Sequence, residues 1–90
     1  MFFKIRKGLA YRKIDGQVFI VDAARERLHE LNAVGSLIWE GLASGKSGER
    51  IIASIAAEFE IDERTARTDL QVFLKELLAS GLIETGDVAQ

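Results

Sequence analysis

The segment Arg25-Glu26-Arg27-Leu28-His29-Glu30-Leu31-Asn32 decides the fold, because the spacing of apolar residues changes near its end. Before it, residues 9–14 and 17–22 are rich in β-branched and aromatic side chains, and Asp15-Gly16 between them suits the tight turn of a hairpin. Residues 17–22 are apolar on both faces, whereas charged side chains dominate residues 25–30. We therefore predict three antiparallel strands, with residues 17–22 in the centre and residues 25–30 at an edge.

After this segment the apolar residues recur at helical spacing, which predicts three helices. A residue whose side chain can cap a helix precedes each of them: Asn32, Ser47 and Asp62. Gly45 and Gly81 are stop signals, and Leu82-Ile83 is expected to fold back as a short apolar tail. The prediction is one α+β domain over residues 1–90, with its core in about residues 9–84. Its fold is winged-helix-like, a three-stranded antiparallel sheet followed by three helices (βββααα).

The composition excludes several kinds of site. The chain of 90 residues contains no Cys and no Pro, so it has no disulfide framework, no thiolate metal site and no thiol nucleophile. His29 is the single histidine and has no carboxylate cluster at metal-ligand spacing, so we predict neither a metal nor a cofactor. No group of residues resembles a catalytic site, and we do not expect an enzyme. The apolar start ends at Lys4, too early for a signal peptide or a membrane span, and we expect a cytoplasmic protein.

Charge is unevenly distributed along the chain. The net charge is −2, yet residues 1–13 carry five basic side chains and no acidic one. Basic residues around an edge strand commonly keep it soluble and prevent it from pairing with other chains, and we adopt this interpretation. The alternative is that the basic segment attracts phosphate or an acidic peptide.

The order of these elements resembles the PqqD family, small proteins similar to the RiPP recognition element, a domain that binds the leader of a ribosomally made precursor peptide. The resemblance covers about residues 9–84 and rests on Gly16, Leu31-Asn32, Gly35, Ile38-Trp39, Gly45, Leu70, Phe73-Leu74, Leu77 and Gly81-Leu82-Ile83. It implies a peptide chaperone without catalytic groups. Such a chaperone presents its leader to a modifying enzyme, commonly a radical S-adenosylmethionine (SAM) protein, in the synthesis of pyrroloquinoline quinone (PQQ) or a related peptide product.

The resemblance also implies where a leader binds. It would add as a strand beside residues 25–30, with its side chains in a groove against the third helix, so that backbone pairing supplies affinity and pockets supply selectivity. Arg27 and His29 stand where such domains often carry apolar or aromatic residues, which leaves the sequence of the leader open. The candidate peptide-binding residues are Arg25, Arg27, Leu28, His29, Glu30, Arg64, Arg67, Gln71, Lys75 and Leu78.

Helical periodicity divides the residues beside the apolar stripe of the third helix into two flanks around Leu70, the centre of that stripe. One flank carries Arg64, Arg67, Gln71, Lys75 and Leu78. The other carries Thr65, Asp69 and Glu76. If the basic flank faces the third strand, the groove is cationic and fits a leader with acidic residues and an apolar anchor. The alternative is that both flanks only solvate the helix.

Two other classes of function compete with peptide binding. A winged-helix regulator could place its third helix in the major groove of a nucleic acid. The acidic residues of that helix and the pI of about 5.4 oppose this, because they repel phosphate. A structural subunit could dimerise through Trp39 or exchange its hairpin, since the open edge strand leaves a homodimer or a domain swap open. No membrane partner is expected.

Overall fold

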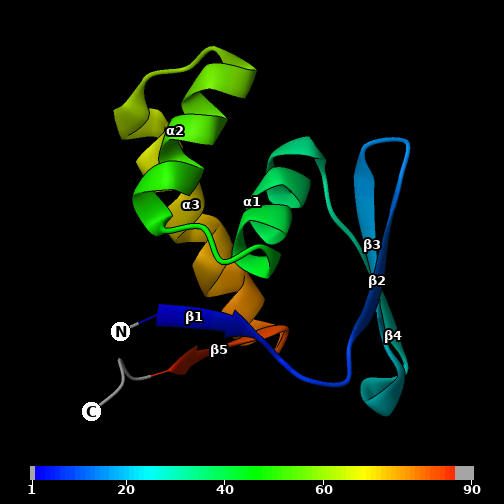
Figure 1. Cartoon of the computed structure of the whole chain (residues 1–90). Helices are drawn as coiled ribbons and strands as arrows, with labels where there is room; N and C mark the ends of the chain where they lie inside the picture. Colours follow the sequence, from blue (N-terminus) through cyan, green and yellow to red (C-terminus); the bar gives the residue numbers. More distant parts are fainter. Residues whose placement is uncertain (1, 87–90) are drawn as a thin grey trace.

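The computed structural model describes residues 2–86, in which five strands, three α-helices and one short 3₁₀ helix follow one another. Their order is β1 (Phe2–Ile5), β2 (Ala10–Ile14), β3 (Gln17–Asp22), η1 (Ala23–Arg25), β4 (Arg27–Glu30), α1 (Ala33–Ala43), α2 (Gly48–Phe59), α3 (Glu63–Ala79) and β5 (Ile83–Gly86). Figure 1 shows the sheet of β2, β3 and β4 standing beside α1, while β1 and β5 lie side by side beneath the helices.

The predicted three-stranded antiparallel sheet followed by three helices is confirmed. Strand β3 is central, with Tyr11 of β2 opposite Ile20 and Leu28 of β4 opposite Val21. The third strand is shorter than predicted, because residues 23–25 form a 3₁₀ turn and Glu26 adopts a left-handed conformation with φ of 55°. Strand β4 therefore begins at Arg27 rather than at residue 25.

The pairing of the two ends of the chain was not predicted. Residues 2–5 form β1, which pairs antiparallel with β5, so that Ile5 lies opposite Ile83. The expected apolar tail is thus the start of a strand, and Leu82 and Ile83 are only 1% and 3% exposed. Three of the five basic residues near the start form ion pairs: Lys4 with Glu84, Arg6 with Asp22 and Lys13 with Glu40, at nitrogen to oxygen distances of 3.4, 2.7 and 3.2 Å.

The three predicted helix caps are confirmed. The Asn32 Oδ1 atom accepts a hydrogen bond from the Gly35 N–H at 2.8 Å. Ser47 and Asp62 accept equivalent bonds from the third residues of α2 and α3. The bond from the Thr65 N–H also lowers the pKa of the Asp62 carboxyl below its ordinary value, since it favours the charged form. These caps fix where each helix begins relative to the sheet.

Two adjoining apolar clusters form the core. One lies between the sheet, α1, α3 and β5 and contains Trp39, which is fully buried and meets the ring of Tyr11 edge-on at 5.5 Å. The other joins the three helices around Ile38 and Ile55. Phe73 packs against both clusters, which places this residue of α3 at the junction of the sheet and the helices.

A buried serine fixes the corner between the sheet and α1. The Ser36 Oγ atom accepts a hydrogen bond from the Val18 N–H at 2.9 Å and donates one to the Leu31 carbonyl at 3.3 Å. The Leu31 N–H in turn donates to the Val18 carbonyl at 2.9 Å. Because these bonds satisfy buried polar groups of both elements, the end of β4 and the start of α1 are held in one arrangement.

Candidate functional site

Strand β4 offers a free edge for another strand. In the order β2–β3–β4 it lies at the end, and within the described residues 2–86 it pairs only with β3. The backbone N–H and C=O groups on its other side are therefore available to an added strand. Arg27 and His29 lie opposite the buried residues Asp22 and Ile20, so they share the inner face of the sheet. Leu28 and Glu30 lie on the outer face by the alternation of a strand.

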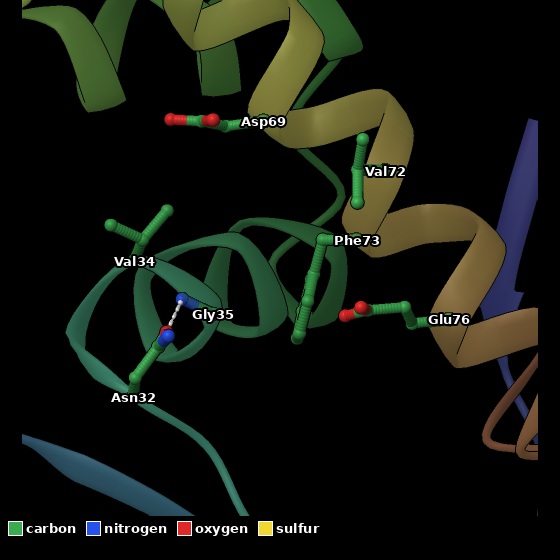
Figure 2. Close-up of a pocket in the computed structure, with 7 residues that line it drawn as sticks. All are labelled: Asn32, Val34, Gly35, Asp69, Val72, Phe73 and Glu76. Atoms are coloured by element: carbon green, nitrogen blue, oxygen red, sulfur yellow. Dashed lines mark hydrogen bonds between the residues drawn. The ribbon is translucent and has the colours of Figure 1, made fainter.

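A groove runs along this edge between β4 and α3. It consists of two adjoining hollows of about 270 and 320 Å³, which share the residues Asn32, Phe73 and Glu76. The first extends over the start of α1 and is drawn in Figure 2. The second extends along β4 to His29 and to Ser80, just beyond the end of α3. Together they form one open channel with the free edge of β4 at its side.

The base of the groove is apolar and depends on a close approach of two helices. Figure 2 shows the Phe73 ring reaching from α3 to the backbone of α1 at Gly35. A Cβ atom at Gly35 would lie 2.8 Å from Phe73 Cζ, closer than two carbon atoms tolerate, so only glycine allows this packing. Val72 stands beside the ring and is 53% exposed. An apolar side chain of a ligand could cover both residues and remove their surface from water.

The charged wall of the groove comes from the flank of α3 that carries Asp69 and Glu76. Both residues line the first hollow, and Figure 2 shows their carboxylates extending from α3 on either side of Val72 and Phe73. The condition for a cationic groove, that the basic flank of α3 faces the third strand, is therefore not met. The physical reason lies in α2, which packs against the other side of α3.

Arg67 shows where the basic flank points. Its guanidinium donates two hydrogen bonds to the Glu49 carboxylate of α2, at 2.8 and 3.1 Å. These bonds and the opposite charge lower the pKa of Glu49 and raise that of Arg67. Arg64, Gln71, Lys75 and Leu78 belong to the same flank by helical periodicity, and all four are exposed. The structure thus separates these five candidates from the groove.

Among the candidates on and near β4, His29 and Glu30 line the groove. His29 lines the second hollow, and its buried Nε2 atom has no hydrogen-bond partner within the described part of the chain. Arg25 lies at the far end, where its Nη1 atom donates to the Ser80 carbonyl at 3.1 Å. Leu28 is 68% exposed. Glu30 accepts a hydrogen bond from Gln17 Nε2 at 3.2 Å. Their contact with a peptide stays a prediction.

Sequence reasoning missed most residues that line the groove. They are Leu31, Asn32, Val34, Gly35, Asp69, Val72, Phe73, Glu76, Leu77, Ser80 and Leu82. The helical periodicity of α3 had already grouped Asp69 with Glu76, but it could not tell which flank faces β4. A usable signal was the amphipathic surface of α2, which requires a neighbouring helix and therefore occupies one side of α3.

Two kinds of feature are absent from the part of the chain that the structure describes. Among residues 2–86 no three His, Cys, Asp or Glu side chains are grouped so that they could hold a metal ion. None of the helices in this described range has the length and apolar character that a membrane crossing requires.

The chain is similar to a known protein family and to solved structures. The sequence model of the family described as coenzyme PQQ synthesis protein D (PqqD) matches residues 17–83. The solved structure of TbiB1 in complex with the TbiA(β) leader peptide is 34% identical, with a TM-score of 0.86 over 94% of this chain and 99% of that chain. The structure of lasso peptide synthetase B1 complexed with the leader peptide is 20% identical, with a TM-score of 0.84 over 92% and 98% of the two chains. No curated protein sequence matches the chain.

Proposed function

Because the chain belongs to the PqqD family, we propose that it binds the leader segment of a ribosomally made precursor peptide and carries out no chemistry on it. Members of this family and of the RiPP recognition elements are non-catalytic peptide-binding domains. The observation that carries the proposal is the likeness to TbiB1, which covers nearly the whole length of both chains and was solved with a leader peptide bound.

The leader binds by strand addition at β4. An extended peptide placed beside this edge satisfies backbone groups that otherwise face water, and each pair of bonds adds affinity without regard to sequence. Alternate side chains of the added strand then point towards α3. One apolar side chain covers Phe73 and Val72, and His29 lines the adjoining hollow that the peptide fills. The groove therefore supplies selectivity and the edge supplies general affinity.

The site that we propose consists of Arg25, Arg27, Leu28, His29 and Glu30 together with the residues of α1 and α3 that line the two hollows. Arg64, Arg67, Gln71, Lys75 and Leu78 are left outside it, since they belong to the opposite flank of α3. The bound precursor is then presented to a modifying enzyme of the radical SAM class, in the synthesis of PQQ or a related peptide product. Family membership supports this finer step.

Titration calorimetry tests the function. The purified protein is titrated with the TbiA(β) leader peptide, with leaders from short reading frames beside its gene, and with random-sequence duplex DNA at moderate salt. We expect micromolar or tighter binding to one leader and no binding to DNA. If the protein binds none of the leaders but binds DNA with an affinity that falls steeply as salt is added, it is instead a nucleic-acid-binding regulator.

Nuclear magnetic resonance locates the bound leader. Addition of the leader should shift the amide signals of β4 and of Gly35, Val72 and Phe73. The signals of Arg64 and Lys75 serve as the internal control, since they lie on the opposite flank of α3. Shifts confined to that flank would place the site elsewhere on the molecule.

A further inference from the structure

We propose that the groove selects leaders that carry a basic side chain opposite Asp69 and Glu76, next to the apolar residue that covers Phe73. This inference rests on the proposed function and names the chemistry of its ligand. It reverses the expectation of an acidic leader, because the flank of α3 that faces β4 is the acidic one.

The two carboxylates are placed to act on one ligand residue. Asp69 and Glu76 are seven residues apart on one helix, about 10 Å along its axis, and both line the hollow beside the start of α1. Within residues 2–86 neither side chain takes part in an ion pair or a side-chain hydrogen bond. A flexible Lys or Arg side chain that extends over Val72 could reach either carboxylate. Both acids are therefore available to a cation that arrives with the peptide.

The N-terminus of α1 is the obvious competing explanation for these acids. It lies across the hollow, and α1 has no acidic residue in its first turn, so its positive end could be what the carboxylates offset. The charge at a helix N-terminus is roughly half an elementary charge, and it is confined to the first turn. Asn32 already accepts the Gly35 N–H there. Two full negative charges against about half a positive one leave the hollow negative by about 1.5 charges.

Basic residues lie beside the other end of the groove. Arg25 is held at Ser80, and Arg27 begins β4 on the inner face of the sheet. A basic ligand residue is thus attracted to the end near α1 and repelled from the end near Ser80. The charges specify a position in the bound leader, and not only its overall composition.

Selection from a random peptide library displayed on phage tests the proposal. The protein is used as the wild type, as the Asp69→Asn/Glu76→Gln variant and as the Asp15→Asn/Glu58→Gln variant. The last is the matched control, because it makes the same change in net charge at exposed residues outside the groove. The wild type and the control should enrich peptides with Lys or Arg at a fixed distance from an apolar residue. The groove variant should lose this preference.

The affinity of the best selected peptide measures how much Asp69 and Glu76 contribute to binding. Exposed ion pairs contribute little each, so we expect the groove variant to bind that peptide about 3- to 10-fold more weakly at low salt. Replacing the basic residue of the peptide by Gln should cause the same loss in the wild type and almost none in the groove variant. Added salt should reduce the difference between them. The peptide substitution needs no protein variant, so it tests the proposal even if the groove variant folds poorly.

Three results are distinguishable. Peptides that bind the wild type without a basic preference, or that bind the groove variant equally well, overturn this inference and leave leader binding standing. Enrichment of acidic residues opposite α3 also overturns it. A library and a set of leaders from which nothing binds would overturn the proposed function and this inference together.

Discussion

Gly35 is the residue on which the shape of the groove depends. Its Gly35→Ala variant would place a Cβ atom 2.8 Å from Phe73 Cζ, and the ring would have to move out of its place between α1 and α3. Overpacking of this kind costs about 1–3 kcal/mol of unfolding free energy. Because the displaced ring moves into the groove, we also expect leader affinity to fall several-fold. Urea denaturation and peptide titration of the same preparation measure the two effects.

Gly48→Ala is the control for this substitution. A Cβ atom at Gly48 would meet nothing within 4 Å, and Gly48 is the first residue of α2 and does not line the groove. Ala favours a helix over Gly, so the control should be as stable as the wild type or slightly more stable, with unchanged leader affinity. Equal stability and affinity of Gly35→Ala and the wild type would show that α1 and α3 do not approach as closely as the structure indicates.

At the scale of one helix, the orientation of α3 separates two accounts of recognition. A charge reversal by Arg64→Glu/Arg67→Glu removes the hydrogen bonds from Arg67 to Glu49 but alters nothing that lines the groove. We expect leader affinity within about twofold of the wild type, since charges across the helix are screened by water. A cationic groove would instead predict a large loss. Calorimetric titration of the variant beside Asp69→Asn/Glu76→Gln decides between them.

The pairing of β1 with β5 gives a second test at this scale. Ile83 begins β5 and is 3% exposed, in the apolar cluster between the sheet, α1 and α3. Ile83→Ala removes buried methylene groups and leaves a cavity, so we expect a loss of about 2–5 kcal/mol in unfolding free energy. Thr85 is an exposed residue of the same strand, so Thr85→Ala is the control and should change stability little. Equal effects of the two substitutions would mean that β5 does not close the core.

Features that depend on local signals could be predicted from the sequence, and features that depend on distant packing could not. The three helices were predictable because Asn32, Ser47 and Asp62 are local signals that act within one turn. The Asp15-Gly16 turn was local too, and both residues have the positive φ that a hairpin of this type needs. The pairing of β1 with β5 joins residues about eighty positions apart, which no local pattern encodes. The side of α3 that faces β4 likewise depends on how α2 packs.

At the scale of the whole molecule, two arginines around the buried carboxylate of Asp22 join segments that are distant in sequence. The Arg6 Nη2 atom donates to Asp22 Oδ2 at 2.7 Å, and Arg6 Nε donates to the Gly81 carbonyl at 2.6 Å. Arg25 lies 3.9 Å from the same carboxylate and donates to Ser80. The ends of β1, β3 and α3 therefore meet at Asp22, which is 1% exposed. Because Arg25 also marks one end of the groove, this cluster positions β4 against α3.

The pH dependence of stability should report this cluster. Burial of Asp22 opposes its charge, but the hydrogen bond and charge of Arg6, followed by those of Arg25, outweigh burial and lower its pKa below the ordinary 3.8. A carboxyl group whose pKa is lower in the folded state stabilises the protein above its unfolded value, and this stabilisation is lost as the pH falls through the folded value. The pKa of Glu49 and of Asp62 is lowered as well, so these groups act in the same direction. We expect the urea midpoint to be constant near neutral pH and to fall steeply below about pH 4.

The variant Asp22→Asn tests the origin of that fall. It keeps the shape of the side chain but cannot carry a charge, so it should be less stable than the wild type at neutral pH and should lose less stability on acidification. Asp15→Asn is the control, since Asp15 is exposed in the hairpin turn and Asn suits its positive φ. If Asp22→Asn and the control follow the wild-type curve in parallel, the ion pair with Arg6 does not hold the ends of the chain together. If only Asp22→Asn flattens the curve, the amide signals of β4 in the same variant should also shift, because the groove and the cluster share Arg25 and Ser80.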